Sequence, residues 1–201
     1  MPLTKSEATR SRILEAARGL FLDQNFATVT TAQIGEAAEV TKGGLYHHFA
    51  SKEELYLAFL REDLAAKEAL FSKAVDLKGT VRERLALLTR SFFELPPALR
   101  KTARLVRRDI NVFAGIYRQQ LVLDYQRALP RQVEAILRDG MADGTLSVTD
   151  PRLLSWHFVA LVEVTLSPYA NSVFENIDSK LELVLDLFLG GASATTGDST
   201  S

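Results

Sequence analysis

The chain has 201 residues, a formal net charge of −1 and no cysteine. A chain of this length can bury a core without cross-links, and the missing thiols exclude disulfide bonds, thiolate metal sites and thiol redox chemistry. No signal-peptide pattern or membrane-length apolar run is present, and the balanced charge gives no general attraction to nucleic acid or lipid. We therefore expect a cytoplasmic protein without a membrane partner, in which any nucleic-acid surface is local.

The apolar residues predict an all-α fold, because they recur with helical spacing and nowhere alternate with period two. In the first fifty residues the pattern predicts three short helices. One carries an apolar stripe that ends at Phe21, the next covers Thr31–Ala38, and the third begins after Thr41. Thr41 is expected to cap the third helix through its hydroxyl.

Longer helices are predicted for most of the remaining chain. The segment from Ala98 to Gly140 is expected to form one or two of them, with a bend at Pro130. Residues 191–201 are small and polar, which is typical of a disordered tail. The other expected helices are Ser51–Val75, Val81–Leu95, Pro151–Tyr169 and Ile177–Leu189.

Residues 30–49, TTAQIGEAAEVTKGGLYHHF, have the pattern of two short helices joined by a tight link. Ile34 on the first helix and Leu45 on the second are expected to face inward, and small residues between them allow a close crossing. This arrangement is a helix-turn-helix. Gly43 and Gly44 each weaken a helix by about 1 kcal/mol relative to alanine. Such a cost fits a backbone that must closely approach another surface.

The longer stretch TTAQIGEAAEVTKGGLYHHFASKEEL resembles the signature of the TetR family of bacterial transcriptional regulators. There are two departures from the family pattern. Glu39 replaces a glycine in the turn, where a positive φ would strain a glutamate, so the turn is expected to close differently. Gly44 replaces a small polar residue that often touches a base. The matching positions are Thr31, Ile34, Ala37, Val40, Thr41, Gly43, Leu45, Tyr46, His48, Phe49, Lys52 and Leu55.

The resemblance implies a DNA surface on the second and third helices. Lys42 and His47 are the candidates for base edges, since both side chains can donate to base acceptors. Phosphate contacts, which position a protein without reading sequence, are implied for Thr31, Tyr46, His48 and Lys52. A metal site at the adjacent His47 and His48 is disfavoured, because their side chains point about 100° apart on a helix. The full predicted DNA-binding set is Thr31, Thr41, Lys42, Gly43, Gly44, Tyr46, His47, His48 and Lys52.

The last two predicted helices are apolar on more than one face. One face can cover the protein's own core, and the other then requires a partner. Two copies that pair these helices with two-fold symmetry would bury both faces, and the resemblance implies the same homodimer. A fully buried hairpin in a monomer is the alternative. The predicted dimer-interface residues are Leu154, Phe158, Leu161, Val162, Leu181, Val184, Leu185 and Phe188.

The resemblance also implies a small-molecule effector site between the middle helices of the larger part. An aromatic stripe at helical spacing is equally what a core presents, and Trp156 and His157 also fit a dimer seam. The arginines between residues 100 and 108 fit either a solvated face or a site for an anionic headgroup. The candidate ligand-binding residues are Phe59, Phe92, Phe93, Arg104, Phe113, Tyr117, Trp156 and His157.

Together these features predict a ligand-responsive DNA-binding transcriptional regulator without a cofactor or metal. By the resemblance it is a repressor that binds a near-palindromic operator as a homodimer and is released by its effector. The predicted domains are a helix-turn-helix domain at 1–52, a ligand-binding and dimerisation domain at 53–190, and the tail at 191–201. An enzyme is disfavoured, because neither a nucleophile elbow nor a phosphate loop is present. A helical module that binds apolar ligands or proteins without reading DNA is the alternative.

Overall fold

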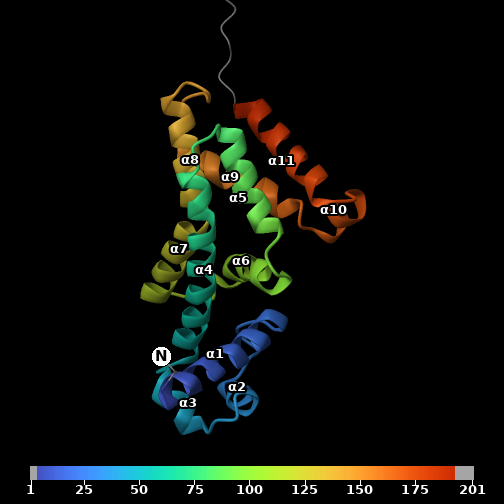
Figure 1. Ribbon diagram of the computed structural model, residues 1–201. Coiled ribbons are helices and arrows are strands. Elements are labelled where there is room, and N and C mark those ends of the chain that lie inside the picture. Colours follow the sequence, from blue (N-terminus) through green and yellow to red (C-terminus); the bar gives the residue numbers. More distant parts are fainter. Residues whose placement is uncertain (1–3, 193–201) are drawn as a thin grey trace, which may run out of the picture. The chain divides into compact units, whose positions relative to one another are not determined.

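The computed structural model describes residues 4–192, and within this range the chain folds into helices without strands (Figure 1). The predicted all-α fold is confirmed. The helices in chain order are α1 (Lys5–Asp23), α2 (Thr31–Ala37), α3 (Lys42–His48), α4 (Lys52–Asp76), α5 (Val81–Phe93), α6 (Pro97–Asp109), α7 (Gly115–Ala128), α8 (Pro130–Ala142), α9 (Pro151–Val164), α10 (Pro168–Val173) and α11 (Ile177–Ala192).

Three expected boundaries in the second half are wrong. The segment expected to form one or two helices forms α6, α7 and α8, because the chain leaves the helix after Asp109 and re-enters it at Gly115 with a positive φ of 56°. The helix expected to reach Tyr169 ends at Val164, and α10 follows as a separate short helix. Residues 191 and 192 belong to α11, while the rest of the predicted tail lies outside the described residues.

The chain divides into two compact units. The first, unit 1, combines Met1–Ala66 with Pro96–Tyr125, and the second, unit 2, combines Lys67–Leu95 with Gln126–Ser201. Their division falls within α4, whereas the predicted domain boundary after residue 52 falls in its first turn. The segment containing α6 therefore packs in the same unit as the helix-turn-helix. The functional roles given to the predicted domains stay predictions.

Unit 1 has a core of five aromatic rings, the aromatic cluster, which comes from α1, the loop after it, α4 and the segment after α6. The ring centroids of Phe21 and Tyr56 lie 4.8 Å apart, and those of Phe26 and Phe113 also lie 4.8 Å apart. Phe59 stacks on Phe21 at 5.6 Å. Close edge-to-face and offset contacts of this kind stabilise a core beyond the area that they bury.

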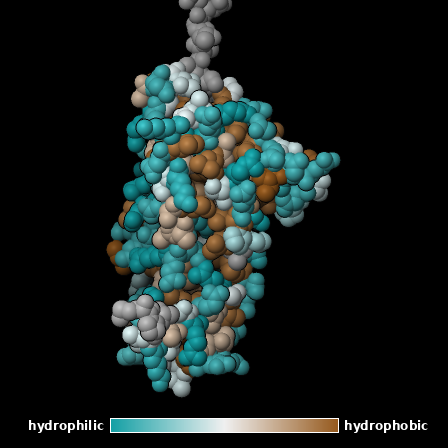
Figure 2. All heavy atoms as spheres, viewed as in Figure 1, coloured by the Kyte–Doolittle hydropathy of each residue, from teal (hydrophilic) through white to brown (hydrophobic). Residues whose placement is uncertain are grey.

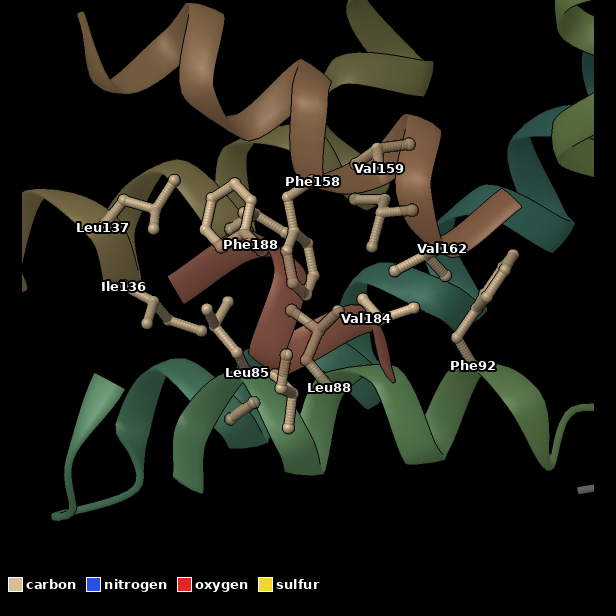
Figure 3. Packing of buried hydrophobic residues seen from close by; sticks show 14 of the residues in the cluster. Leu85, Leu88, Phe92, Ile136, Leu137, Phe158, Val159, Val162, Val184 and Phe188 are labelled. Carbon is tan, nitrogen blue, oxygen red and sulfur yellow. The ribbon is translucent and has the colours of Figure 1, made fainter. Parts of the chain in front are cut away.

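Unit 2 has a separate hydrophobic core between α5, α8, α9 and α11 (Figure 3). Leu85 and Leu88 of α5 point toward Phe158 of α9 and Val184 of α11 in that view. Helix α8 comes so close to α5 that a Cβ at Gly140 would lie 2.4 Å from a methyl carbon of Val81. Glycine is therefore required inside α8, whereas Gly144 shapes the turn that follows, with a φ of 81°.

The predicted dimer interface largely describes this internal core. Six of its eight residues are buried within the protomer itself, and the other two, Leu154 and Leu161, pack against the same core. The reason is that α9 and α11 are apolar on two sides, and spacing alone does not determine which side faces the protomer. The six buried residues are Phe158, Val162, Leu181, Val184, Leu185 and Phe188.

Candidate nucleic-acid interface

Helices α2 and α3 form the predicted helix-turn-helix, and each begins with a threonine cap. Thr30 caps α2 in a reciprocal pair with Gln33, and the hydroxyl of Thr41 accepts from the amide of Gly44 at 3.1 Å, as predicted. In the turn, the amide of Val40 donates to the carbonyl of Gly35 at 2.9 Å. A Cβ at Gly35 would lie only 3.1 Å from the Val40 carbonyl oxygen, so a glycine lets the link pass this closely.

Glu39 occupies the turn with a φ of 55°. The expectation that the glutamate makes the turn close differently is therefore wrong. Two short helices joined by this few residues need a left-handed residue at the bend. The glutamate adopts that conformation although its Cβ makes it unfavourable by about 1–2 kcal/mol.

We expect Glu39→Gly to raise the free energy of unfolding by about 0.5–1 kcal/mol. Glycine removes the left-handed strain, and its greater freedom in the unfolded chain offsets part of the gain. Urea unfolding measures the change, with Glu39→Ala as the control that removes the carboxylate and keeps the strain. A gain in the alanine variant as large as that in the glycine variant would assign the effect to the carboxylate charge and contradict the strain argument.

The side chains expected to read DNA lie on the outward face of α3. Leu45 is fully buried and anchors the inward face, while Lys42, Tyr46 and His47 are exposed. The phenol oxygen of Tyr46, a residue 42% exposed, lies 3.4 Å from the hydroxyl of Thr31 at the start of α2. The two helices therefore bring a phenol and a hydroxyl together on one surface.

The other predicted members lie around this face. Thr41 and Gly43 are exposed, and Gly44 and His48 are half-buried. Added side-chain carbon at Gly43 would meet open space, so no packing within the protein requires a glycine there. This supports the interpretation that the space is kept for an approaching surface. Whether each residue touches DNA stays a prediction.

Lys52 has an internal role that the sequence did not reveal. Its amino group donates to the carbonyl oxygens of Phe26 and Val29 at 2.8 and 2.9 Å, and it lies 4.3 Å from the ring centroid of Phe26. Two of its three donors thus hold the loop between α1 and α2. One N–H is left for the predicted phosphate contact.

Sequence reasoning also missed Arg10. Its guanidinium lies 5.1 Å from the ring centroid of Phe49, at the end of α3, and pairs with Glu62 of α4 at 3.5 Å. An arginine over an aromatic face is a stabilising contact. Arg10 and Glu62 are separated by 52 positions, so no local pattern could have indicated this link between α1 and α4.

The predicted ligand residues do not form one group within either unit. Phe59 and Phe113 belong to the aromatic cluster of unit 1, and Phe92 and Phe93 belong to the core of unit 2. The side chain of Arg104 lies outside the described part of the structure. Three more predicted residues are exposed, namely Tyr117 on α7 and both Trp156 and His157 on α9.

Trp156 borders a cleft of about 170 Å³ in unit 2, which is lined by Gln126, Pro130, Arg131, Glu134, Arg152 and Trp156. Within the described range, no cluster of three or more potential ligands could hold a metal ion. None of the described helices is both long and apolar enough to cross a membrane.

Comparison with known proteins identifies the N-terminal part of the chain. Residues 13–59 match the family described as bacterial regulatory proteins, tetR family. The chain is 36% identical over 73 residues to the transcriptional regulator UidR of Escherichia coli K12. This alignment covers 36% of this chain and 37% of that protein. It is 36% identical over 85 residues to the transcriptional repressor KstR2 of Mycobacterium tuberculosis H37Rv, or 42% of each chain. The matched region thus spans well under half the length of these curated relatives, which are regulators and not enzymes.

Solved structures show that the similarity of fold extends over nearly the whole chain. FadR from Bacillus subtilis, solved in complex with stearoyl-CoA, matches with a TM-score of 0.75 at 20% identity, covering 90% of this chain and 98% of that one. SmeT, the repressor of the multidrug efflux pump SmeDEF of Stenotrophomonas maltophilia, matches with a TM-score of 0.69 at 24% identity, covering 96% and 94%. At these identities the likeness establishes the fold alone.

Proposed function

We propose that this chain, whose residues 13–59 match the tetR family of bacterial regulatory proteins, is a cytoplasmic DNA-binding transcriptional regulator that works without enzymatic activity. The observation that carries the proposal is the exposed face of α3, where Lys42 and His47 lie beside the paired Thr31 and Tyr46. A short helix of this size fits the major groove, with phosphate contacts on its flank.

The direct test is selection of bound duplexes from a random-sequence DNA library, followed by footprinting of the selected duplex. We expect a protected site with two-fold symmetry and an affinity that falls linearly with salt on a double logarithmic plot, as counterions are released from phosphates. If the selection enriches no sequence and the protein shows no salt-dependent binding to DNA, the proposal that it reads DNA is contradicted. It would favour the alternative, a helical module that binds apolar ligands or proteins.

A homodimer is the assembly that the outward faces of α9 and α11 support best. Leu153, Trp156 and Val164 follow one another along one exposed face of α9, and Leu183 and Leu187 do so on α11. Figure 2 shows that hydrophobic residues reach the surface among hydrophilic ones in unit 2. A second copy that covers the same faces by two-fold symmetry would remove them from water.

We expect Leu187→Glu to convert the dimer to a monomer at micromolar concentration. The side chain is 59% exposed in the protomer, so the change places a charge in the interface and leaves the internal core intact. Sedimentation velocity measures the outcome, with Leu77→Glu as a control at an exposed leucine that follows the end of α4. A wild-type monomer, or an equal effect of both substitutions, would exclude these faces as the interface.

We further propose that DNA binding responds to a small-molecule effector and that the protein is a repressor. Support comes from a relative named as a repressor and from the fold shared with a regulator solved with stearoyl-CoA. An effector can release DNA only through a difference in its affinity for the two shapes of the protein. A thermal-shift screen tests for effectors, because binding to the native state raises the apparent stability.

A further inference from the structure

The loop of residues 24–30, between α1 and α2, is held at both ends by long side chains from elsewhere in unit 1. Lys52 of α4 binds the carbonyl of Phe26 within the loop and that of Val29 near its α2 end. At its start, the guanidinium of Arg108 on α6 donates to the carbonyl of Gln24 at 3.3 Å. The loop leads directly into the cap of α2 and then into Thr31. Its position therefore fixes where the helix-turn-helix begins.

A buried carboxylate directs the guanidinium of Arg108. Asp109 is 3% exposed, and its two oxygens accept from the Nε and Nη2 of Arg108 at 2.8 and 2.7 Å. The hydroxyl of Tyr56 donates to the same carboxylate at 2.6 Å. A carboxylate removed from water is tolerated only when such bonds compensate for the lost hydration. Breaking these bonds would therefore leave a buried charge uncompensated, which strongly disfavours any arrangement without them.

Apolar contacts also hold this loop. Phe26, within the loop, packs against Phe113, which follows α6, and both rings contact Tyr56, at 5.0 and 5.3 Å between centroids. Burial, and then the bond to Asp109, raise the pKa of the Tyr56 phenol. The phenol therefore stays protonated and keeps its role as a donor.

We propose that Tyr56, Arg108 and Asp109 are positioning residues for DNA reading, which hold the loop of residues 24–30 and thereby set α2 and α3 in the orientation that binds a duplex. The inference rests on the proposed DNA-binding function and names residues that no pattern in the helix-turn-helix identifies. Their bonds are directed into the protein, to the loop and to one another. These three residues therefore affect the fraction of molecules in which α2 and α3 are oriented for DNA binding. They do not change which residues contact the DNA.

This distinction has a measurable consequence. When a substitution lowers the competent fraction, the apparent Kd rises in inverse proportion to that fraction. The slope of affinity against salt stays the same, because it counts the phosphates that the bound protein neutralises. Loss of a direct phosphate contact lowers both the affinity and the slope.

The test compares Tyr56→Phe and Arg108→Gln with the wild type on the duplex that the wild type selects. Tyr56→Phe removes one hydroxyl and keeps the buried ring, and Arg108→Gln removes the fork that reaches the loop carbonyl. The matched control is Tyr169→Phe, at a residue 78% exposed on α10 of unit 2. Circular dichroism verifies that each variant is folded, and the two variants cut the network at different bonds.

We expect each of the two variants to raise the Kd by about tenfold with an unchanged salt slope, and to accelerate amide hydrogen exchange in residues 24–30. The control should leave both quantities as in the wild type. Faster exchange with an unchanged Kd would make the network merely structural and overturn the proposal. A reduced salt slope would overturn it as well, by assigning these residues to DNA contact. A wild-type protein that selects no duplex would instead contradict the proposed function.

Discussion

Replacement of Arg18 by methionine is expected to lower the free energy of unfolding by about 3–5 kcal/mol, because it leaves a buried carboxylate without its counter-charge. Asp63 is 3% exposed and forms an ion pair with Arg18. Its other oxygen accepts from the hydroxyl of Thr102 at 2.6 Å. Without the arginine, the Thr102 hydroxyl still donates to Asp63, but it is a neutral donor and does not replace the lost positive charge. Chemical denaturation monitored by circular dichroism measures the loss.

The double substitution Arg18→Met with Asp63→Asn is the informative control. An asparagine keeps an oxygen for the Thr102 hydroxyl and carries no charge. We expect the double variant to be more stable than Arg18→Met alone. Removing one charge of a buried ion pair lowers the free energy of unfolding more than replacing both charged residues together. If the single variant loses less than about 1 kcal/mol, the size of an ordinary surface pair, the Arg18–Asp63 pair is not the buried link that the geometry indicates.

The parts of the structure that the sequence predicted are those with local signals. The cap at Thr41 lies three residues from the amide that it binds, and Leu45 and Phe49 are four apart on one helical face. Such spacings have a direct physical meaning within a single helix. The helix-turn-helix, its inward side and its exposed side could therefore be predicted from about twenty residues.

The parts that could not be predicted depend on contacts between distant positions. Tyr56 and Asp109 are 53 residues apart, and Arg18 and Asp63 are 45 apart. No periodic pattern relates such pairs, so the association of α6 with the helix-turn-helix had no signal. The inward face of α9 was ambiguous for another reason. Its apolar residues surround most of the helix, and both Trp156 and Phe158 satisfied the pattern, although only Phe158 is buried.

Glu39 shows how topology overrides a local preference. The residue type argued against a left-handed conformation, yet the bend between α2 and α3 imposes it. The cost is small beside the burial of Ile34 and Leu45, which the bend permits. A local rule is therefore weak evidence where a short link must join two packed helices.

Lys42→Ala is expected to weaken binding to the selected duplex by about 100-fold or more. An exposed lysine at the start of α3 can donate to a guanine edge, and each such contact is worth about 1–3 kcal/mol. A dimer loses two of them, one per half-site, so the losses combine. Lys42 is exposed, so we expect the melting temperature to stay unchanged.

The pattern of the loss decides what Lys42 contacts. If it reads a base, Lys42→Ala relaxes the preference at one symmetric pair of positions and leaves the others as they were. If it binds a phosphate, affinity falls equally for all sequences and the salt slope decreases by about one for each lost contact. Lys73→Ala, at an exposed lysine in the last turn of α4, controls for the general loss of positive charge. An equal reduction in both variants would mean that Lys42 contributes only charge, and the assignment of the α3 face as a reading surface would have to rest on His47 and Tyr46.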